Sequence, residues 1–279
     1  MSKQRTTGGR PTYTAPRERY GKRTLAKGVE LLEDTKVTGL NNNVLVIGNS
    51  GCGKTGSYIC SVLKNIKSSV ILQDVKGLLY DMFAGELRAK GYNIIKLDFT
   101  EPEKSQGYNP LAAVKRNKDG SIYEPDVKAI ADAISPVNSG CKEPYWDMSA
   151  ASMIEFAIAY ALEALPKEYH NMTSVLELFH TYIQNNGDAY FVKWIKDNPN
   201  TLSTRLFSET QATRPSDRTF ASTAGIAASH LNCFNMKELR YIFNNKISVD
   251  LADIGRRKTA VFIKTSDTEH NLDNLVSLF

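Results

Sequence analysis

The sequence lacks the features that mark membrane-spanning and exported chains. No run approaches the ~20 consecutive apolar residues that span a bilayer. The N-terminal segment MSKQRTTGGRPTY has no apolar core of the kind found in signal peptides. We therefore expect a chain that neither spans a membrane nor is exported by this route.

Cysteine and histidine are also scarce. The four cysteines form no C-x-x-C pair, and none of the four histidines has a partner four residues away. This spacing predicts neither a zinc site nor a disulfide framework, and it favours the reducing cytoplasm. Hydrophobic residues at 42% and charged residues at 23% are typical of a folded protein, and 279 residues suffice for one large domain or two ordinary ones.

Positive charge is concentrated at the N-terminus. Residues 1–30 hold eight Lys or Arg against Glu18 and Glu30, a net charge of +6, whereas the whole chain carries only +5. The remaining residues are therefore nearly neutral, and the basic character belongs to an N-terminal arm. Such an arm could bind nucleic acid or acidic lipid headgroups. The alternative is a solvated, disordered tail that has no specific partner.

The strongest signal in the sequence is a phosphate-binding loop. Val44–Ile47 is a short apolar run typical of a buried central strand. Residues 48–55 then match G-x-x-x-x-G-K-[ST] at every position, and a helix is predicted to follow. Strand, loop and helix in this order predict nucleotide binding.

The chemistry of the motif explains its spacing. Its glycines let successive backbone N–H groups point at phosphate oxygens at a helix N-terminus. Lys54 is expected to hold the β- and γ-phosphates of ATP, and the Thr55 hydroxyl to bind Mg²⁺. These two are the candidate catalytic residues, and Thr55 is the candidate metal ligand. The candidate nucleotide-binding residues are Gly48, Asn49, Ser50, Gly51, Cys52, Gly53, Lys54 and Thr55.

The segments after the loop alternate in the manner of an α/β sheet. We predict strands at 69–74 and 93–98, with an amphipathic helix at 78–90 that stops at Gly91. Asp74 and Asp98 fall at strand ends, where such sheets place groups that face a ligand. The alternative is that each aspartate only begins a turn, because neither has a partner fixed by the local sequence.

From about residue 124 the pattern becomes helical, which predicts an all-helical insertion. Ser174–Glu177 reads as a capping box that opens one of the helices. Tyr145, Trp146 and Trp194 are interpreted as packing residues rather than base-stacking platforms. The chain returns to the sheet in a buried strand at 259–264. The predicted helices span 124–134, 148–165, 188–196 and 219–231, besides the one that starts near 174.

Five segments resemble the coupling proteins of conjugative type IV secretion, the TraG and TraD type of DNA-pumping ATPase. They are NNNVLVIGNSGCGKT (41–55), ILQDVKGLLYDM (71–82), KSQGYNPLAAV (104–114), EPYWDMSAASMIEFAIAYALE (143–163) and RRKTAVFIKTSDTEHNLDNLVSLF (256–279). The resemblance implies an α/β, RecA-like P-loop NTPase sheet interrupted by an all-helical domain. The implied parts are a basic arm (1–40), a first NTPase part (41–115), the helical domain (116–215) and a second NTPase part (216–279).

The same resemblance implies a hexameric ring that binds ATP between subunits and works at the cytoplasmic face of the cell membrane. It moves single-stranded DNA and the attached relaxase toward the secretion channel. Another segment or another protein would supply the membrane association.

The sequence departs from the family pattern in several places. Asp74-Val75-Lys76-Gly77 stands where Asp-Pro-Lys-Gly is usual, and Leu78 replaces a common acidic residue. Family members usually start with transmembrane helices. In them, a strand ending in Asp-Glu also follows the segment that corresponds to residues 276–279 (VSLF) of this chain. Neither is present here, so we expect a truncated form. A sheet that lacks this strand next to the phosphate loop would expose an apolar edge and face, which predicts poor solubility or dependence on a missing piece.

Three functional classes remain open. The first is the N-terminal part of a DNA-translocating ATPase, whose intact form hydrolyses ATP. The second is a nucleotide-binding assembly module that does not hydrolyse ATP, because the acidic pair is missing. The third is an unrelated P-loop transferase or small-molecule kinase.

Deleting residues 1–30 tests the role of the basic arm. Because this segment carries the excess positive charge, the deletion should weaken binding to DNA or to anionic membranes and flatten its salt dependence. Titration of both ligands at several salt concentrations measures the effect. Binding that changes in neither affinity nor salt slope would make the arm a passive tail.

Overall fold

A computed structural model describes residues 22–278, apart from 27, 138–142, 213, 245–247 and 267–272. Most of the basic arm therefore lies outside the described residues. The strands are β1 (Lys22–Ala26), β2 (Val29–Leu32), β3 (Val70–Gln73), β4 (Asn93–Asp98) and β5 (Thr259–Lys264).

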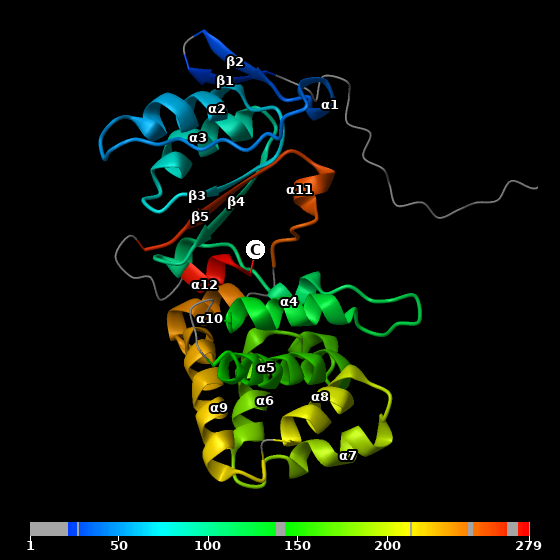
Figure 1. Cartoon of the computed structure of the whole chain (residues 1–279). Coiled ribbons are helices and arrows are strands. Elements are labelled where there is room, and N and C mark those ends of the chain that lie inside the picture. The colour runs from blue at the N-terminus through cyan, green and yellow to red at the C-terminus, as the bar shows by residue number, and fades with distance from the viewer. Residues whose placement is uncertain are drawn as a thin grey trace, which may run out of the picture. The chain divides into compact units, whose positions relative to one another are not determined.

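Strands β3, β5 and β4 form a three-stranded sheet in that order (Figure 1). The Asn93 N–H donates to the Lys258 carbonyl oxygen (2.8 Å), and six residues further along both strands the Phe99 N–H donates to that of Lys264 (3.0 Å). An offset that stays constant along two strands is the mark of parallel pairing. The predicted strands at 69–74, 93–98 and 259–264 are thereby confirmed.

Twelve α-helices are named in the described part of the chain. They are α1 (Thr35–Thr38), α2 (Cys60–Asn65), α3 (Leu78–Ala89), α4 (Glu124–Ile134), α5 (Tyr145–Ala164), α6 (Met172–Ile183), α7 (Ala189–Asp197), α8 (Leu202–Gln211), α9 (Asp217–Leu231), α10 (Lys237–Phe243), α11 (Asp253–Arg256) and α12 (Asp273–Val276). The predicted helices at 78–90, 124–134, 148–165, 188–196 and 219–231 correspond to α3, α4, α5, α7 and α9. Gly91 ends α3 as expected, with φ of 83° and its N–H donating to the Arg88 carbonyl oxygen (3.0 Å).

The chain divides into two compact units. Unit 1 comprises 1–72, 77–95 and 251–262, and unit 2 comprises 73–76, 96–250 and 263–279. Helix α5 is the centre of unit 2, where α4, α6, α8 and α9 pack against it. The expected boundary after residue 215 falls between α8 and α9, which both belong to this helical body.

The core of unit 1 lies between the sheet and helices α2 and α3. Leu63 from α2 and Phe83 from α3 meet Phe262 from β5, and all three are at most 2% exposed. Tyr80 sets its ring edge-on to Phe262, with centroids 5.4 Å apart. Burying side chains of this size contributes roughly 1.5–3 kcal/mol each, so this contact fixes the two helices on the sheet.

An antiparallel β1–β2 hairpin begins the described chain (Figure 1). It was not predicted, because its residues fall in the segment interpreted as a basic arm. Strand β1 packs against the helix that follows the phosphate loop. From Lys22 onward the expected arm is therefore part of the fold of unit 1, and a deletion that tests the arm alone stops at residue 21.

The prediction of a buried central strand at Val44–Ile47 is wrong. The segment is not assigned to a strand, and Leu45 and Ile47 are 84% and 85% exposed. Among the described residues it pairs with no strand, so it lacks the neighbours that a buried central strand requires. The expectation that the sheet would expose an apolar edge and face stays a prediction.

The predicted capping box is also wrong in its position. Helix α6 is capped by Asn171, whose side-chain oxygen accepts from the Ser174 N–H (3.0 Å). Ser174 itself is buried in the first turn of the helix. Asn and Ser have similar capping preferences, so the sequence alone does not decide between them.

The interpreted packing role of the aromatics holds for Trp194, whose ring contacts that of Tyr160 with centroids 5.2 Å apart. Tyr145 is 51% exposed and is therefore not a core residue, although its ring contacts that of Trp146 with centroids 5.4 Å apart. In the described ranges, no helix is both long and apolar enough to cross a membrane.

Replacing the observed cap tests the start of α6. Asn171→Ala should lower the free energy of unfolding by about 1 kcal/mol, because the first-turn N–H of Ser174 loses its acceptor. Chemical denaturation followed by circular dichroism measures it. Ser174→Ala is the matched control, and a larger loss in that variant would support the capping box instead.

Candidate phosphate-binding site

The backbone of residues 48–55 has the shape that the motif predicts. Gly51 and Gly53 take positive φ values of 78° and 87°, which a residue with a side chain adopts only with strain. A Cβ at Gly48 would stand 2.4 Å from the Cys52 sulfur, so the exposed Cys52 side chain would have to move. The backbone conformation of the loop therefore explains Gly51 and Gly53.

A helix starts directly after the loop, as predicted. It opens with a π-helical turn (Lys54–Ile59) and continues as α2. Gly53 stands at the cap position, and no side chain caps the helix. Its first N–H groups are therefore open to an anion, with the positive end of the helix dipole behind them.

Lys54 is folded back over the loop. Its Nζ donates to the carbonyl oxygens of Gly48 (2.7 Å) and Asn49 (2.9 Å), and it lies 3.9 Å from the Cys52 sulfur. Thr55 is exposed, so its hydroxyl is accessible to a ligand. The loop thus brings together one ammonium group, one free hydroxyl and an uncapped helix start.

The chain that leads into the loop is held by a polar clamp that sequence reasoning missed. Arg23 of β1 pairs with Glu33 through its Nε (2.9 Å) and donates from NH2 to the Asn42 carbonyl oxygen (3.0 Å). The Asn42 side chain in turn donates to the Glu33 carbonyl oxygen (2.9 Å). No local motif signals these contacts, because the partners are nine to nineteen residues apart.

The residues of the loop fit the phosphates of a nucleotide. An anion at the helix start would meet open N–H groups and could exchange the two carbonyl contacts of Lys54 for charge-assisted ones. The exposed Thr55 hydroxyl is the type of oxygen ligand that Mg²⁺ takes beside phosphate and water. Within the described ranges, His, Cys, Asp and Glu side chains form no group of three or more that could hold a metal ion.

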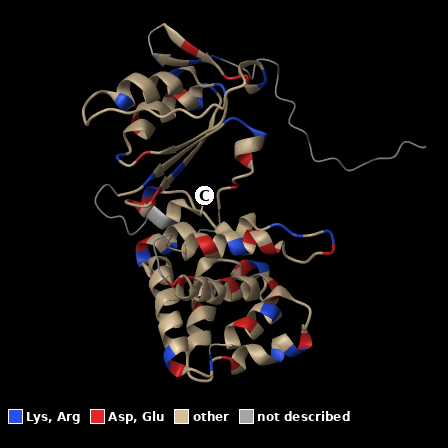
Figure 2. Cartoon of the chain, viewed as in Figure 1, with Lys and Arg blue, Asp and Glu red and all other residues tan. Residues whose placement is uncertain are grey.

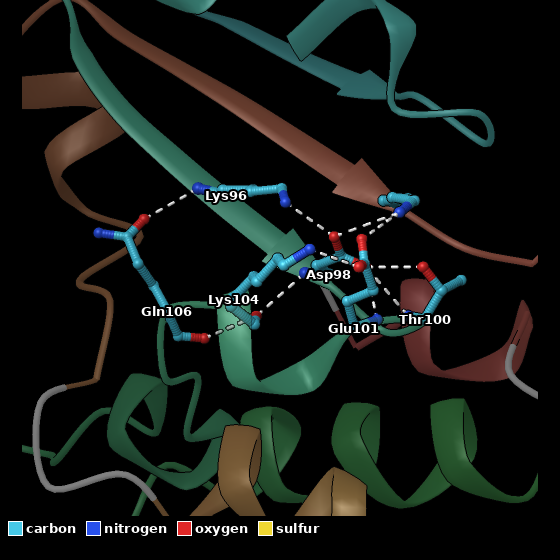
Figure 3. A network of polar contacts seen from close by, with 8 residues as sticks. Lys96, Asp98, Thr100, Glu101, Lys104 and Gln106 are labelled. Atoms are coloured by element: carbon cyan, nitrogen blue, oxygen red, sulfur yellow. Dashed lines mark hydrogen bonds and ion pairs between the residues drawn. The ribbon is translucent and has the colours of Figure 1, made fainter. Parts of the chain in front are cut away.

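Asp98, at the end of β4, is the centre of a polar network in unit 2 (Figure 3). It is fully buried, and its Oδ1 accepts from the Thr100 hydroxyl (2.8 Å), the Thr100 N–H (3.1 Å) and the Glu101 N–H (2.9 Å). Its Oδ2 faces the Nζ atoms of Lys96 (2.8 Å) and Lys264 (3.5 Å). The carboxylate therefore ties β4, β5 and the turn after β4 together.

The same contacts set the ionisation of Asp98. Burial alone would raise its pKa, but the hydrogen bonds from Lys96, Glu101 and Thr100 and the charge of Lys96 outweigh this, and the pKa lies below its ordinary value. Both oxygens face protein groups, which favours the turn-forming interpretation of Asp98 over a ligand-facing role.

The other candidate strand end is arranged differently. Asp74 is buried after β3, where its N–H donates to the Ile263 carbonyl oxygen (2.8 Å), and Lys76 is exposed. Gly77 takes a positive φ of 71° and starts α3. A role of Asp74 or Lys76 in nucleotide binding stays a prediction.

A parallel sheet flanked by helices, with a full G-x-x-x-x-G-K-[ST] loop at the start of one of them, defines an α/β protein of the P-loop class. The profile of the type IV secretory system conjugative DNA transfer family matches residues 7–279. The chain therefore belongs to this family. No curated protein matches the sequence.

Two solved structures of the bacterial conjugative coupling protein TrwB have a similar fold. The unbound form has a TM-score of 0.58 at 16% identity, over 92% of this chain and 53% of that one. The complex with ADP and Mg²⁺ has a TM-score of 0.56 at 15% identity, over 92% of this chain and 54% of the other. The chain thus spans about half the length of these TrwB chains.

Asp98→Asn tests the network through its pH dependence. Because the folded-state pKa is lowered, the stabilisation is present above the unfolded pKa of about 3.9 and is lost as the pH falls through the folded value. The variant should lose on the order of 2 kcal/mol of unfolding free energy at neutral pH and much less near pH 3. Denaturant titrations at both pH values measure this, with the exposed Asp197→Asn as control. A loss that is the same at both pH values would contradict the assignment.

Proposed function

We propose that the chain is the ATP-binding part of a conjugative coupling protein, which moves single-stranded DNA and its attached relaxase to the type IV secretion channel. The observation that best supports this proposal is the phosphate loop, in which Lys54 donates to two loop carbonyl oxygens and an uncapped helix follows. Membership of the DNA transfer family supports DNA and secretion components as partners.

In this proposal the loop residues 48–55 bind the phosphates of ATP. Lys54 places its charge against the β- and γ-phosphates, and Thr55 binds Mg²⁺. When bound, ATP supplies the phosphoanhydride bond whose hydrolysis drives movement. The ADP and Mg²⁺ bound to TrwB, a protein of similar fold, support this choice of cofactors.

The proposal extends to the assembly. A RecA-like motor works as a hexameric ring with ATP between subunits, and a coupling protein acts at the cytoplasmic face of the cell membrane. The membrane association would come from another segment or protein. The similarity of the fold to TrwB supports the RecA-like part of this picture.

Lys54→Ala tests the nucleotide site. The substitution removes charge-assisted contacts worth roughly 1.5–3 kcal/mol, so the affinity for a fluorescent ATP analogue with Mg²⁺ should fall by about 10- to 100-fold. Lys118→Ala, which removes an exposed lysine from unit 2, is the matched control and should bind normally. Unchanged affinity in the Lys54 variant would contradict the assignment of the nucleotide site.

Hydrolysis assays separate the remaining functional classes. ATP hydrolysis stimulated by single-stranded DNA supports the motor. Binding without hydrolysis, with or without DNA, favours an assembly module that uses ATP only to join subunits. Phosphorylation of a small acceptor without any DNA effect would instead indicate a transferase or kinase.

A further inference from the structure

A cluster of positive side chains lies at the edge of unit 1 where the three parallel strands begin. It comes from three connections that are far apart in the sequence: the turn between α2 and β3, the end of α3, and the residues just before β5. Figure 2 marks the last of these as a blue segment next to α11. We call this surface the basic edge, and its members are Lys64, Lys67, Arg88, Lys90, Arg257 and Lys258, all exposed.

Hydrogen bonds hold the backbones of these connections together. The Tyr92 hydroxyl donates to the carbonyl oxygens of Ile66 (3.0 Å) and Ser68 (3.1 Å). The Ser69 hydroxyl lies 3.2 Å from the carbonyl oxygen of Arg257, to which it donates. The Asn93 N–H donates to the carbonyl oxygen of Lys258. The basic residues therefore project from one fixed scaffold rather than from separate loops.

Two side-chain contacts also join the members of the edge. Lys90 donates from its Nζ to the Lys64 carbonyl oxygen (2.8 Å), which brings the ends of α2 and α3 together. The Lys258 Nζ lies 5.9 Å from the centroid of the Tyr92 ring. These contacts link the end of α2 to the end of α3, and Lys258 to Tyr92, which follows α3.

Most of this charge is not neutralised within the protein. Lys90 pairs with Glu86 (2.6 Å), and Arg257 pairs with Asp253 (2.5 Å). Among the described residues no carboxylate pairs with the other four members of the edge. A surface with several unpaired cationic side chains has a positive local potential, which attracts an anionic ligand.

The net charge of the chain after residue 30 is close to zero, so the net charge alone does not reveal the basic edge. Beyond residue 30, unit 1 holds nine Lys or Arg against five Asp or Glu, whereas unit 2 as a whole holds 18 against 23. The two units therefore have opposite signs, and the excess positive charge of the folded part of unit 1 gathers at this edge.

We infer that the basic edge binds the phosphate backbone of single-stranded DNA. Membrane-surface binding normally combines basic residues with exposed apolar anchors, but here Leu63, Leu87 and Tyr92 are buried. The neighbours that are exposed, Asn65 and Ser68, are polar groups of the type that contact phosphates. This inference extends the proposed function by naming a surface that meets its DNA substrate.

The test is a triple substitution in the full chain, Lys64→Ala with Lys67→Ala and Lys258→Ala. Removing three phosphate contacts should weaken binding of a labelled mixed-sequence oligonucleotide roughly 10- to 100-fold near 0.1 M salt and make the salt slope shallower by about 2. Fluorescence anisotropy at several salt concentrations measures both. The matched control removes three exposed lysines of unit 2, by Lys118→Ala, Lys193→Ala and Lys196→Ala, and should bind normally.

Further measurements separate the possible outcomes. The same three positions changed to arginine should keep DNA binding, which excludes a folding defect. Equal losses in the triple variant and its control, or no loss in either, overturn the inference. Loss of binding to phosphatidylserine vesicles with DNA binding intact also overturns it, in favour of a membrane surface.

Nucleotide binding distinguishes this inference from the proposed function. The triple alanine variant should bind the ATP analogue normally, because its lysines lie outside the phosphate loop. If Lys54→Ala leaves ATP binding unchanged while the triple variant still loses DNA binding, the assignment of the nucleotide site is wrong. The inference that the basic edge binds DNA is then still supported.

Discussion

Strand β5 hydrogen-bonds to both of its neighbours in the sheet, and the rest of the architecture depends on that double pairing. Its four inner residues, Ala260–Ile263, are at most 2% exposed. Since the whole helical body is inserted between β4 and β5, the central strand forms only after a contact across more than 160 residues. Such a non-local pairing carries a large loop-closure cost, which the buried strand must offset.

The register of β5 also positions charged groups at both of its ends. At its start, the residues before Thr259 add Arg257 and Lys258 to the basic edge of unit 1. At its end, Lys264 supplies an ammonium group to Asp98 and Glu101 in unit 2. A shift of one residue would move these groups away and would turn the buried side chains to the other face.

How much could be predicted from sequence depended on whether the signal was local. The bounds of β4, β5 and α4 were predicted as they occur, because a buried apolar run or an amphipathic period specifies the element. Val44–Ile47 carries an equally apolar run, yet a strand needs a neighbour, and no sequence window contains that information. The ion pairs of Arg23 with Glu33 and of Asp98 with Lys264 join residues far apart in the sequence and were missed for the same reason. The backbone role of Gly51 and Gly53 in the phosphate loop was predictable, because glycine is the residue that adopts positive φ without strain.

The contacts of Lys54 explain how the loop keeps its shape before any anion arrives. The two carbonyl oxygens that accept from its Nζ belong to the first residues of the motif, so the ammonium group closes the loop over itself. Because Gly48 and Asn49 are exposed, water could take over both carbonyl groups if the lysine turned to a phosphate, as the proposed function requires. The exchange therefore leaves no buried acceptor unpaired, and the gain of a charge-assisted contact is not cancelled by desolvation. A loop with buried carbonyl groups would resist the same exchange, so the exposure of this segment favours reversible binding of an anion.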